Sequence, residues 1–184
     1  MHLRKLAGAP ATALAIAALA GCGSSGSSSS VTPAAYVKSI CTAVTPFEAD
    51  VVRRSGELNL TTLANAEEGK KAIQGFLSAV SDDTDRALSK LKGAGTPNVS
   101  NGKQLADTVV SAFTQLKAAV GHALAQAKAL PTSSPEAFKT AATHLGTTVR
   151  TSMSGIGSSL DKLKSPELEK AAAKEPACTS LGAA

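Results

Sequence analysis

The sequence predicts an all-α fold, an up-down-up-down four-helix bundle with a short C-terminal fifth helix, preceded by a signal peptide and a flexible tether. Four long stretches of the 184-residue chain carry apolar residues three or four positions apart, the period of a helix with one buried face. Short segments rich in glycine and proline separate them, and short connections favour antiparallel neighbours. Two cysteines, Cys41 and Cys178, lie near the two ends of this region, which such a bundle brings together.

Residues 1–21 predict a signal peptide that is removed from the mature chain. Arg4 and Lys5 precede residues 6–20, which are mainly alanine and leucine. This apolar stretch is shorter than the roughly 20 residues that a membrane-spanning helix needs. It is therefore interpreted as a processed leader and not as a transmembrane segment.

The leader ends at Leu19-Ala20-Gly21-Cys22, which resembles the lipobox of bacterial lipoproteins. By this resemblance Cys22 becomes the first residue of the mature chain and is acylated, with a diacylglyceryl group and palmitate. Stable anchoring takes more than one acyl chain, which such a group provides. The alternative interpretation is an ordinary signal peptide with a chance cysteine. Residues 22–32 are expected to be the lipidated cysteine and a Gly/Ser tether, with a mean reach of about 17 Å, and residues 33–184 the bundle domain.

The remaining cysteines, Cys41 and Cys178, predict a disulfide, because an even pair outside the cytoplasm is normally oxidised. A bridge that closes so long a loop contributes about 5 kcal/mol in the chain-entropy description. The alternative is a pair of buried thiols. Loss of the leader lowers the formal charge from +5 to +3, a mildly basic value that suits an anionic membrane or wall surface but is too weak to indicate nucleic acid.

The first helix is expected to begin at Thr32-Pro33, with threonine as the cap and proline at the first helical position. Pro46 is expected to kink or break this helix because proline removes a backbone hydrogen bond, and the helix should end near Ser55-Gly56. Its apolar stripe consists of Val37, Ile40, Val44, Phe47 and Val51.

The second helix is expected from about Thr62 to Lys92, with Thr84 on its buried face. A threonine there can donate its hydroxyl to a preceding carbonyl. Asp82 and Arg86 are expected to form an i,i+4 ion pair on the solvated side, as are Glu67 and Lys71. The apolar stripe consists of Leu63, Ala66, Ile73, Leu77, Val80, Ala87 and Leu91.

Three further helices follow. The third covers about 100–130, and Ser134-Pro135 begins the fourth with a capping serine and a first-turn proline. Ser165-Pro166 begins a short fifth helix that ends near Lys174. The third stripe consists of Leu105, Val109, Ala112, Leu116, Ala119, Ala123 and Ala127, and the fourth of Phe138, Ala142, Leu145, Val149, Met153, Ile156, Leu160 and Leu163.

The sequence predicts no catalytic residues, no cofactor and no metal site. His122 and His144 could lie at similar heights on antiparallel helices, but each stands about 120° from its apolar stripe, so we expect surface histidines. Asp82, Asp83 and Asp85 resemble an acidic metal cluster, but on a helix their carboxylates point in different directions, and a solvated face is expected.

The whole pattern resembles the small alanine-rich secreted lipoproteins of high-GC Gram-positive bacteria, a group whose function is largely unassigned. No catalytic or binding residue is implied by the resemblance. The segments that carry it are Leu19-Ala20-Gly21-Cys22, Tyr36-Val37-Lys38-Ser39-Ile40-Cys41, 130–138 and Glu175-Pro176-Ala177-Cys178.

These observations predict a lipid-anchored protein on the extracytoplasmic face of the cell membrane. We expect a noncatalytic binding or scaffold module of the cell envelope, with an envelope protein as a possible partner and no nucleic acid. The alternative is a carrier of a lipid or small hydrophobic ligand within the bundle. An enzyme is disfavoured because no acid, base and nucleophile converge in the sequence. A cavity between the helices would favour carriage, and an exposed apolar patch would favour a protein partner.

Overall fold

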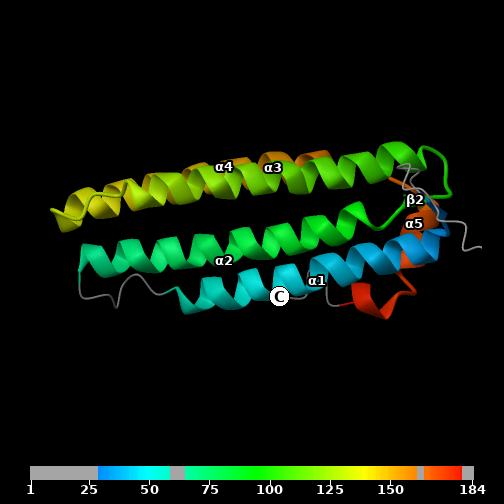
Figure 1. Ribbon diagram of the computed structural model, residues 1–184, viewed down its shortest axis with the longest axis horizontal. Coiled ribbons are helices and arrows are strands. Elements are labelled where there is room, and N and C mark those ends of the chain that lie inside the picture. The colour runs from blue at the N-terminus through cyan, green and yellow to red at the C-terminus, as the bar shows by residue number, and fades with distance from the viewer. Residues whose placement is uncertain (1–28, 59–64, 161–163, 180–184) are drawn as a thin grey trace, which may run out of the picture.

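Four long helices lie side by side and alternate in direction in the computed structural model, which describes residues 29–58, 65–160 and 164–179 (Figure 1). The all-α fold with a short C-terminal helix is confirmed. The signal peptide, Cys22 and most of the tether lie outside the described residues. In chain order the elements are β1 (Ser30–Val31), α1 (Pro33–Glu57), α2 (Ala66–Lys92), β2 (Thr96–Pro97), α3 (Gly102–Lys128), α4 (Pro135–Leu160), α5 (Pro166–Ala172) and the 3-10 turn η1 (Pro176–Cys178).

Capping side chains fix where the helices begin. Thr32 accepts a hydrogen bond from the backbone N–H of Ala35 at 3.2 Å, and Ser165 caps α5 in the same way, as the sequence predicts. Ser134 likewise accepts from the N–H of Ala137 at 3.3 Å. Helix α2 begins at Ala66, where the side chain of Asn65 caps it, and not at Thr62 as expected. Thr62 itself lies outside the described residues.

The expected interruption of the first helix at Pro46 does not end it, since α1 continues to Glu57. Apolar side chains on both sides of Pro46, such as Val44 and Phe47, pack against the same core cluster. Phe47 also meets Phe113 of α3 edge to face, with the ring centroids 5.7 Å apart. This packing offsets the lost backbone hydrogen bond and keeps the helix in register across the proline.

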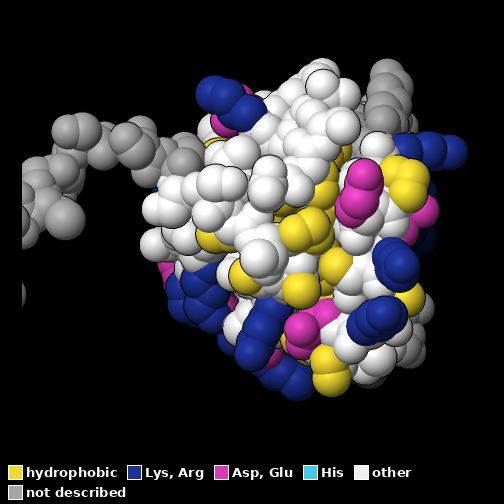
Figure 2. Space-filling model, turned by 90° about the vertical axis from the view of Figure 1, so that its right-hand side faces the viewer, with side chains coloured by type: hydrophobic (Ala, Val, Ile, Leu, Met, Phe, Trp, Pro, Cys, Tyr) yellow, Lys and Arg dark blue, Asp and Glu magenta, His cyan; other side chains and the backbone are white. Residues whose placement is uncertain are grey.

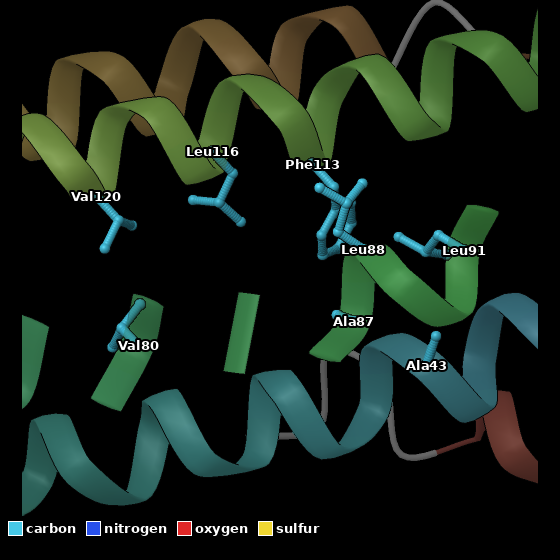
Figure 3. Packing of buried hydrophobic residues seen from close by; sticks show 8 residues of the cluster. All are labelled: Ala43, Val80, Ala87, Leu88, Leu91, Phe113, Leu116 and Val120. Atoms are coloured by element: carbon cyan, nitrogen blue, oxygen red, sulfur yellow. The ribbon is translucent and has the colours of Figure 1, made fainter. Parts of the chain in front are cut away.

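The core consists of two apolar clusters that follow the chain order of the helices. Thr84 on α2 is fully buried, and its hydroxyl donates to the carbonyl of Val80 at 2.7 Å, as expected. The first cluster joins α1, α2 and α3 (Figure 3) and contains Ala43, Val80, Ala87, Leu88, Leu91, Phe113, Leu116 and Val120. The second joins α2, α3 and α4 and contains Ile73, Leu77, Ala123, Ala127, Leu130 and Leu145.

Helix α4 is more exposed than its apolar stripe predicts. Met153 is 40% exposed, although we expected it on the buried face, and only Leu145 of the described α4 side chains is fully buried. The reason is the packing order: the extensive contacts join α1 to α2, α2 to α3 and α3 to α4. With its main neighbour on one side, α4 can bury only a narrow strip of its surface.

One end of the bundle gathers the chain's entry, the α2–α3 connection and the C-terminal segment. We call it the entry end; it comprises residues 29–44, 88–109 and 164–179 (Figure 1). Strands β1 and β2 pair there in parallel, and Asn98 donates to the carbonyl of Val31 at 2.8 Å. Residues 30–32, which we expected in the tether, are therefore part of the folded domain.

Two glycines allow the backbone to come this close at the entry end. Gly95 has a φ of 79°, and a Cβ at this position would lie 2.7 Å from the carbonyl oxygen of Ser29. At Gly102, the first residue of α3, a Cβ would overlap the carbonyl oxygen of Pro97. Side chains at either position would push β1 or β2 away from its neighbour.

The predicted disulfide is present: Cys41 on α1 is bonded to Cys178 in η1, with their Cα atoms 5.1 Å apart. Thr45, one turn further along α1, donates its hydroxyl to the carbonyl of Ala177 at 2.8 Å. These two links hold the C-terminal segment against the start of α1.

Replacing both cysteines, in a Cys41→Ser/Cys178→Ser variant, should lower the free energy of unfolding by about 3–5 kcal/mol, because the bridge closes a loop of 137 residues. Urea unfolding of the oxidised protein and the variant measures this difference. Equal unfolding midpoints for the two proteins would contradict it.

Gly102→Ala should lower the free energy of unfolding by about 1–3 kcal/mol, because the new methyl group meets a backbone carbonyl that cannot move aside without disturbing β2. Gly121→Ala is the matched control in the same helix. Nothing lies within 4 Å of a Cβ there, so this change should raise stability by up to about 1 kcal/mol through helix propensity. Thermal unfolding of both variants tests the pair, and a loss of the same size in both would contradict the steric argument.

Candidate functional site: an apolar pocket beside the disulfide

The histidines of the sequence analysis lie on the surface. His122 on α3 and His144 on α4 are both exposed. Among the described residues, no group of three His, Cys, Asp or Glu side chains could hold a metal ion. The lipidation candidate, Cys22, lies outside the described residues.

The three neighbouring aspartates point in three directions, as expected for a helix, but they do not form a solvated face. Asp82 is exposed, and Asp85 pairs with Lys117 of α3 at 2.6 Å. Asp83 instead is only 4% exposed and faces α1. The expected solvated face is therefore wrong for Asp83.

Asp83 connects α2 to α1 through charge. One carboxylate oxygen pairs with Arg86, so the expected pair of Arg86 with Asp82 is replaced by one with Asp83. The other oxygen lies 3.9 Å from Nε of Arg54, and these two buried atoms have no hydrogen-bond partner among the described residues. Arg54 also lies 3.8 Å from Asp50, whose pKa is lowered mainly by its hydrogen bond with Arg53. The sequence contains a signal for this burial, because Asp83 lies three residues after Val80 and four before Ala87 on the buried stripe.

An apolar hollow lies at the entry end, between α1, α3 and α5. Its volume is about 260 Å³. Cys41 forms part of the wall, so the disulfide to Cys178 lies directly beside it. The lining residues are Tyr36, Val37, Ile40 and Cys41 of α1, Leu105 and Val109 of α3, and Ser165, Leu168, Glu169 and Ala172 from the α5 segment.

The few polar groups of the pocket have local roles. Ser165 caps α5, and its hydroxyl donates to the carboxylate of Glu167 at 3.0 Å. Burial raises the pKa of Tyr36 to about 12, with the negative charge of Asp107 as the second cause. The phenol therefore stays neutral at physiological pH. The walls thus offer apolar contact to a ligand.

A larger hollow of about 690 Å³ lies at the same end, between β1, the α2–α3 connection and α3. Its lining includes Lys92, Asp107 and Ser111, so it is more polar than the pocket beside the disulfide. The smaller pocket beside the disulfide is the better candidate for an apolar ligand, because removing its apolar walls from water is favourable in free energy.

This pocket is not predictable from the sequence, although several of its residues lie on predicted helices. Leu168 and Ala172 stand four residues apart and share one face of α5. That spacing indicates an apolar face, but a helix of seven residues does not reveal which elements it covers. In the folded protein, the Cys41–Cys178 disulfide holds the C-terminal segment that contains α5 against α1.

Comparison with protein-family models, curated proteins and solved structures finds no match for this chain. Among the described helices, none has the length and apolar character needed to cross a membrane.

Asp83→Ala should lower the free energy of unfolding by about 2 kcal/mol, because it leaves the buried Nε of Arg54 without its counter-charge. This is less than for a fully buried pair, since the side chain of Arg54 is 35% exposed. Asp82→Ala, one residue away and exposed, is the control and should change stability by no more than about 0.5 kcal/mol. Chemical denaturation measures both, and similar effects of the two changes would refute the buried pair.

Tyr36 should ionise with a pKa of about 12, against 10 for an ordinary tyrosine. Because the folded protein holds this proton more tightly than the unfolded chain, its contribution to stability is complete below pH 10 and is lost as the pH rises toward 12. Tyr36 is the one tyrosine of the chain, so the phenolate absorbance reports on it alone. Asp107→Asn should lower the pKa of Tyr36, but not to the ordinary value of 10, since burial is the larger cause of the shift. A wild-type midpoint near 10 would contradict the burial of the phenol.

Proposed function

We propose that this chain is a lipoprotein anchored to the extracytoplasmic face of the cell membrane, and that its helical domain is a noncatalytic binding or scaffold module of the cell envelope. The leader and Leu19-Ala20-Gly21-Cys22 support the anchor by their pattern. The Cys41–Cys178 disulfide supports the compartment, because such bridges persist outside the reducing cytoplasm.

The observation that carries the proposed binding role is the apolar pocket beside this disulfide. An apolar hollow that remains open to water is costly, and burying its walls against a ligand would recover that cost. Covalent attachment of η1 to α1 supports the role further, because it keeps the nearby α5 wall in place before a ligand arrives. A site formed in advance loses less conformational entropy on binding.

The second candidate function is carriage of a lipid or small hydrophobic ligand, which the apolar lining favours. A volume of about 260 Å³ is slightly below the 300–1,000 Å³ range of pockets that enclose drug-sized ligands. It suits one apolar chain or side chain better than a whole lipid. The pocket therefore supports binding of an apolar group that belongs to a larger molecule more than it supports carriage of an enclosed one.

The anchor is tested in the bacterium that makes the protein. Globomycin, or the change Cys22→Ser, should leave the precursor uncleaved or the product without lipid, because the thiol is the attachment point. Mass spectrometry of the purified protein measures both the cleavage site and the acylation. Unchanged processing would refute the lipoprotein assignment.

The pocket is tested with a photoactivatable diazirine fatty acid and the purified mature protein held in an amphipathic polymer. Cross-links should concentrate on peptides that contain Val109 and Leu168, two lining residues from different helices. Ala172→Phe should reduce them at least about fivefold by filling the pocket, whereas Ala173→Phe, on an exposed neighbouring residue, should not. Cross-links spread evenly over all helices, or equal labelling of the two variants, would refute this binding site.

A further inference from the structure

The excess positive charge of the domain is concentrated at the entry end. Outside the entry end, the chain from Cys22 onward carries ten Lys and Arg and ten Asp and Glu. The entry end carries seven lysines, all exposed, and four carboxylates, so the whole formal excess of three charges is located there. The lysines are Lys38, Lys90, Lys92, Lys103, Lys164, Lys170 and Lys174, and the carboxylates are Asp107, Glu167, Glu169 and Glu175.

The apolar pocket is at this same end. Figure 2, which looks onto this end, shows apolar side chains with both basic and acidic side chains around them. Lys38 directly follows the lining residue Val37, and Lys170 directly follows Glu169. Glu169 itself lines the pocket and opposes an anionic ligand, and Asp107 pairs with Lys103 at 2.5 Å. The net charge of the entry end as a whole is nevertheless positive.

The chain reaches the domain at this end as well. Ser29 accepts a hydrogen bond from the N–H of Thr96 at the entry end. Seven residues, 22–28, separate it from the point at which Cys22 would be anchored. Such a segment has a mean reach of about 15 Å and a fully extended length of about 24 Å. An anchor at Cys22 would therefore hold the entry end within about that distance of the bilayer.

We propose that the entry end docks on the membrane that carries the anchor, where its lysines contact anionic phospholipid headgroups and the apolar pocket takes up part of one acyl chain of such a lipid. This inference rests on the proposed function in one respect, the anchor, which supplies proximity. The charge and the pocket are properties of the folded domain.

The physical balance favours this occupant over a free hydrophobic molecule in water. An acyl chain that moves from the bilayer into the pocket passes between two apolar environments, so its own transfer free energy is small. The free energy of the complex falls, because the apolar walls of the pocket lose their contact with water. Each lysine brought to an anionic surface strengthens binding by about fivefold at physiological salt, and this gain falls as salt screens the charges.

The chain has one tyrosine, Tyr36, and no tryptophan, and Tyr36 lines the pocket. Its fluorescence therefore reports directly on the occupant. The mature protein is reconstituted into vesicles of phosphatidylglycerol and phosphatidylcholine in which the phosphatidylglycerol acyl chains are brominated, and into matched vesicles without bromine. Bromine should quench the tyrosine emission at least about twofold. Ala172→Phe should abolish the quenching, and Ala173→Phe should preserve it.

The charge requirement is tested in the same assay. Lys38→Glu combined with Lys170→Glu should reduce the quenching severalfold, whereas Lys139→Glu on exposed α4, away from the entry end, should not. Absence of quenching in the brominated anionic vesicles would overturn the proposal, and so would equal quenching when only the phosphatidylcholine carries bromine.

Flotation in high salt separates this proposal from the anchor. A lipidated protein floats with vesicles at any salt concentration. A protein that does not float in high salt lacks the anchor and refutes the lipoprotein assignment. If this protein still shows bromine quenching in low salt, the docking proposal stands without the anchor; if it shows none, the docking proposal is refuted as well.

Discussion

The covalent link between Cys41 and Cys178 is the constraint on which the functional end of this molecule depends. Without it, α5 is a helix of seven residues with no fully buried side chain of its own. Such a helix has little intrinsic stability, because nucleating a helix costs more than two turns of hydrogen bonds return. The bridge, together with the hydrogen bond from Thr45 to the Ala177 carbonyl, holds the C-terminal segment on α1. That attachment helps to hold the α5 wall of the apolar pocket, and α5 also packs directly on α1.

Elsewhere at the entry end, backbone segments lie unusually close to one another. Parallel pairing of β1 with β2 ties the start of the chain to the α2–α3 connection. Gly95 and Gly102 make this pairing possible, because any side chain there would meet a backbone carbonyl. Backbone pairing thus ties down the chain where it enters, and α4 on the opposite side of α3 is the more exposed element. Binding at a preformed site loses less conformational entropy than binding at a mobile one.

Charge is used differently in the two parts of the molecule. Between the C-terminal part of α1 and helix α2, Asp50, Arg54, Asp83 and Arg86 form a network that couples the two helices. A buried ion pair adds little net stability, but removing one partner is costly because the other charge stays buried. At the entry end the lysines are exposed and exceed the carboxylates, which gives that surface a directional attraction for anions. The first arrangement serves the fold, and the second is available for recognition.

The sequence by itself determined the helical elements, three of the four long-helix starts, the buried threonine and the cysteine pair, because these depend on local periodicity, capping chemistry and the parity of the cysteines. Thr32, Ser134 and Ser165 act within four residues of their partners, so nothing distant is needed to predict them. The tertiary structure alone decided the rest. The continuity of α1 through Pro46, the burial of Asp83 and the exposure of Met153 each depend on which helix lies opposite. The pocket likewise joins residues more than 130 positions apart, and no periodic pattern within one helix can specify what a neighbouring helix presents to it.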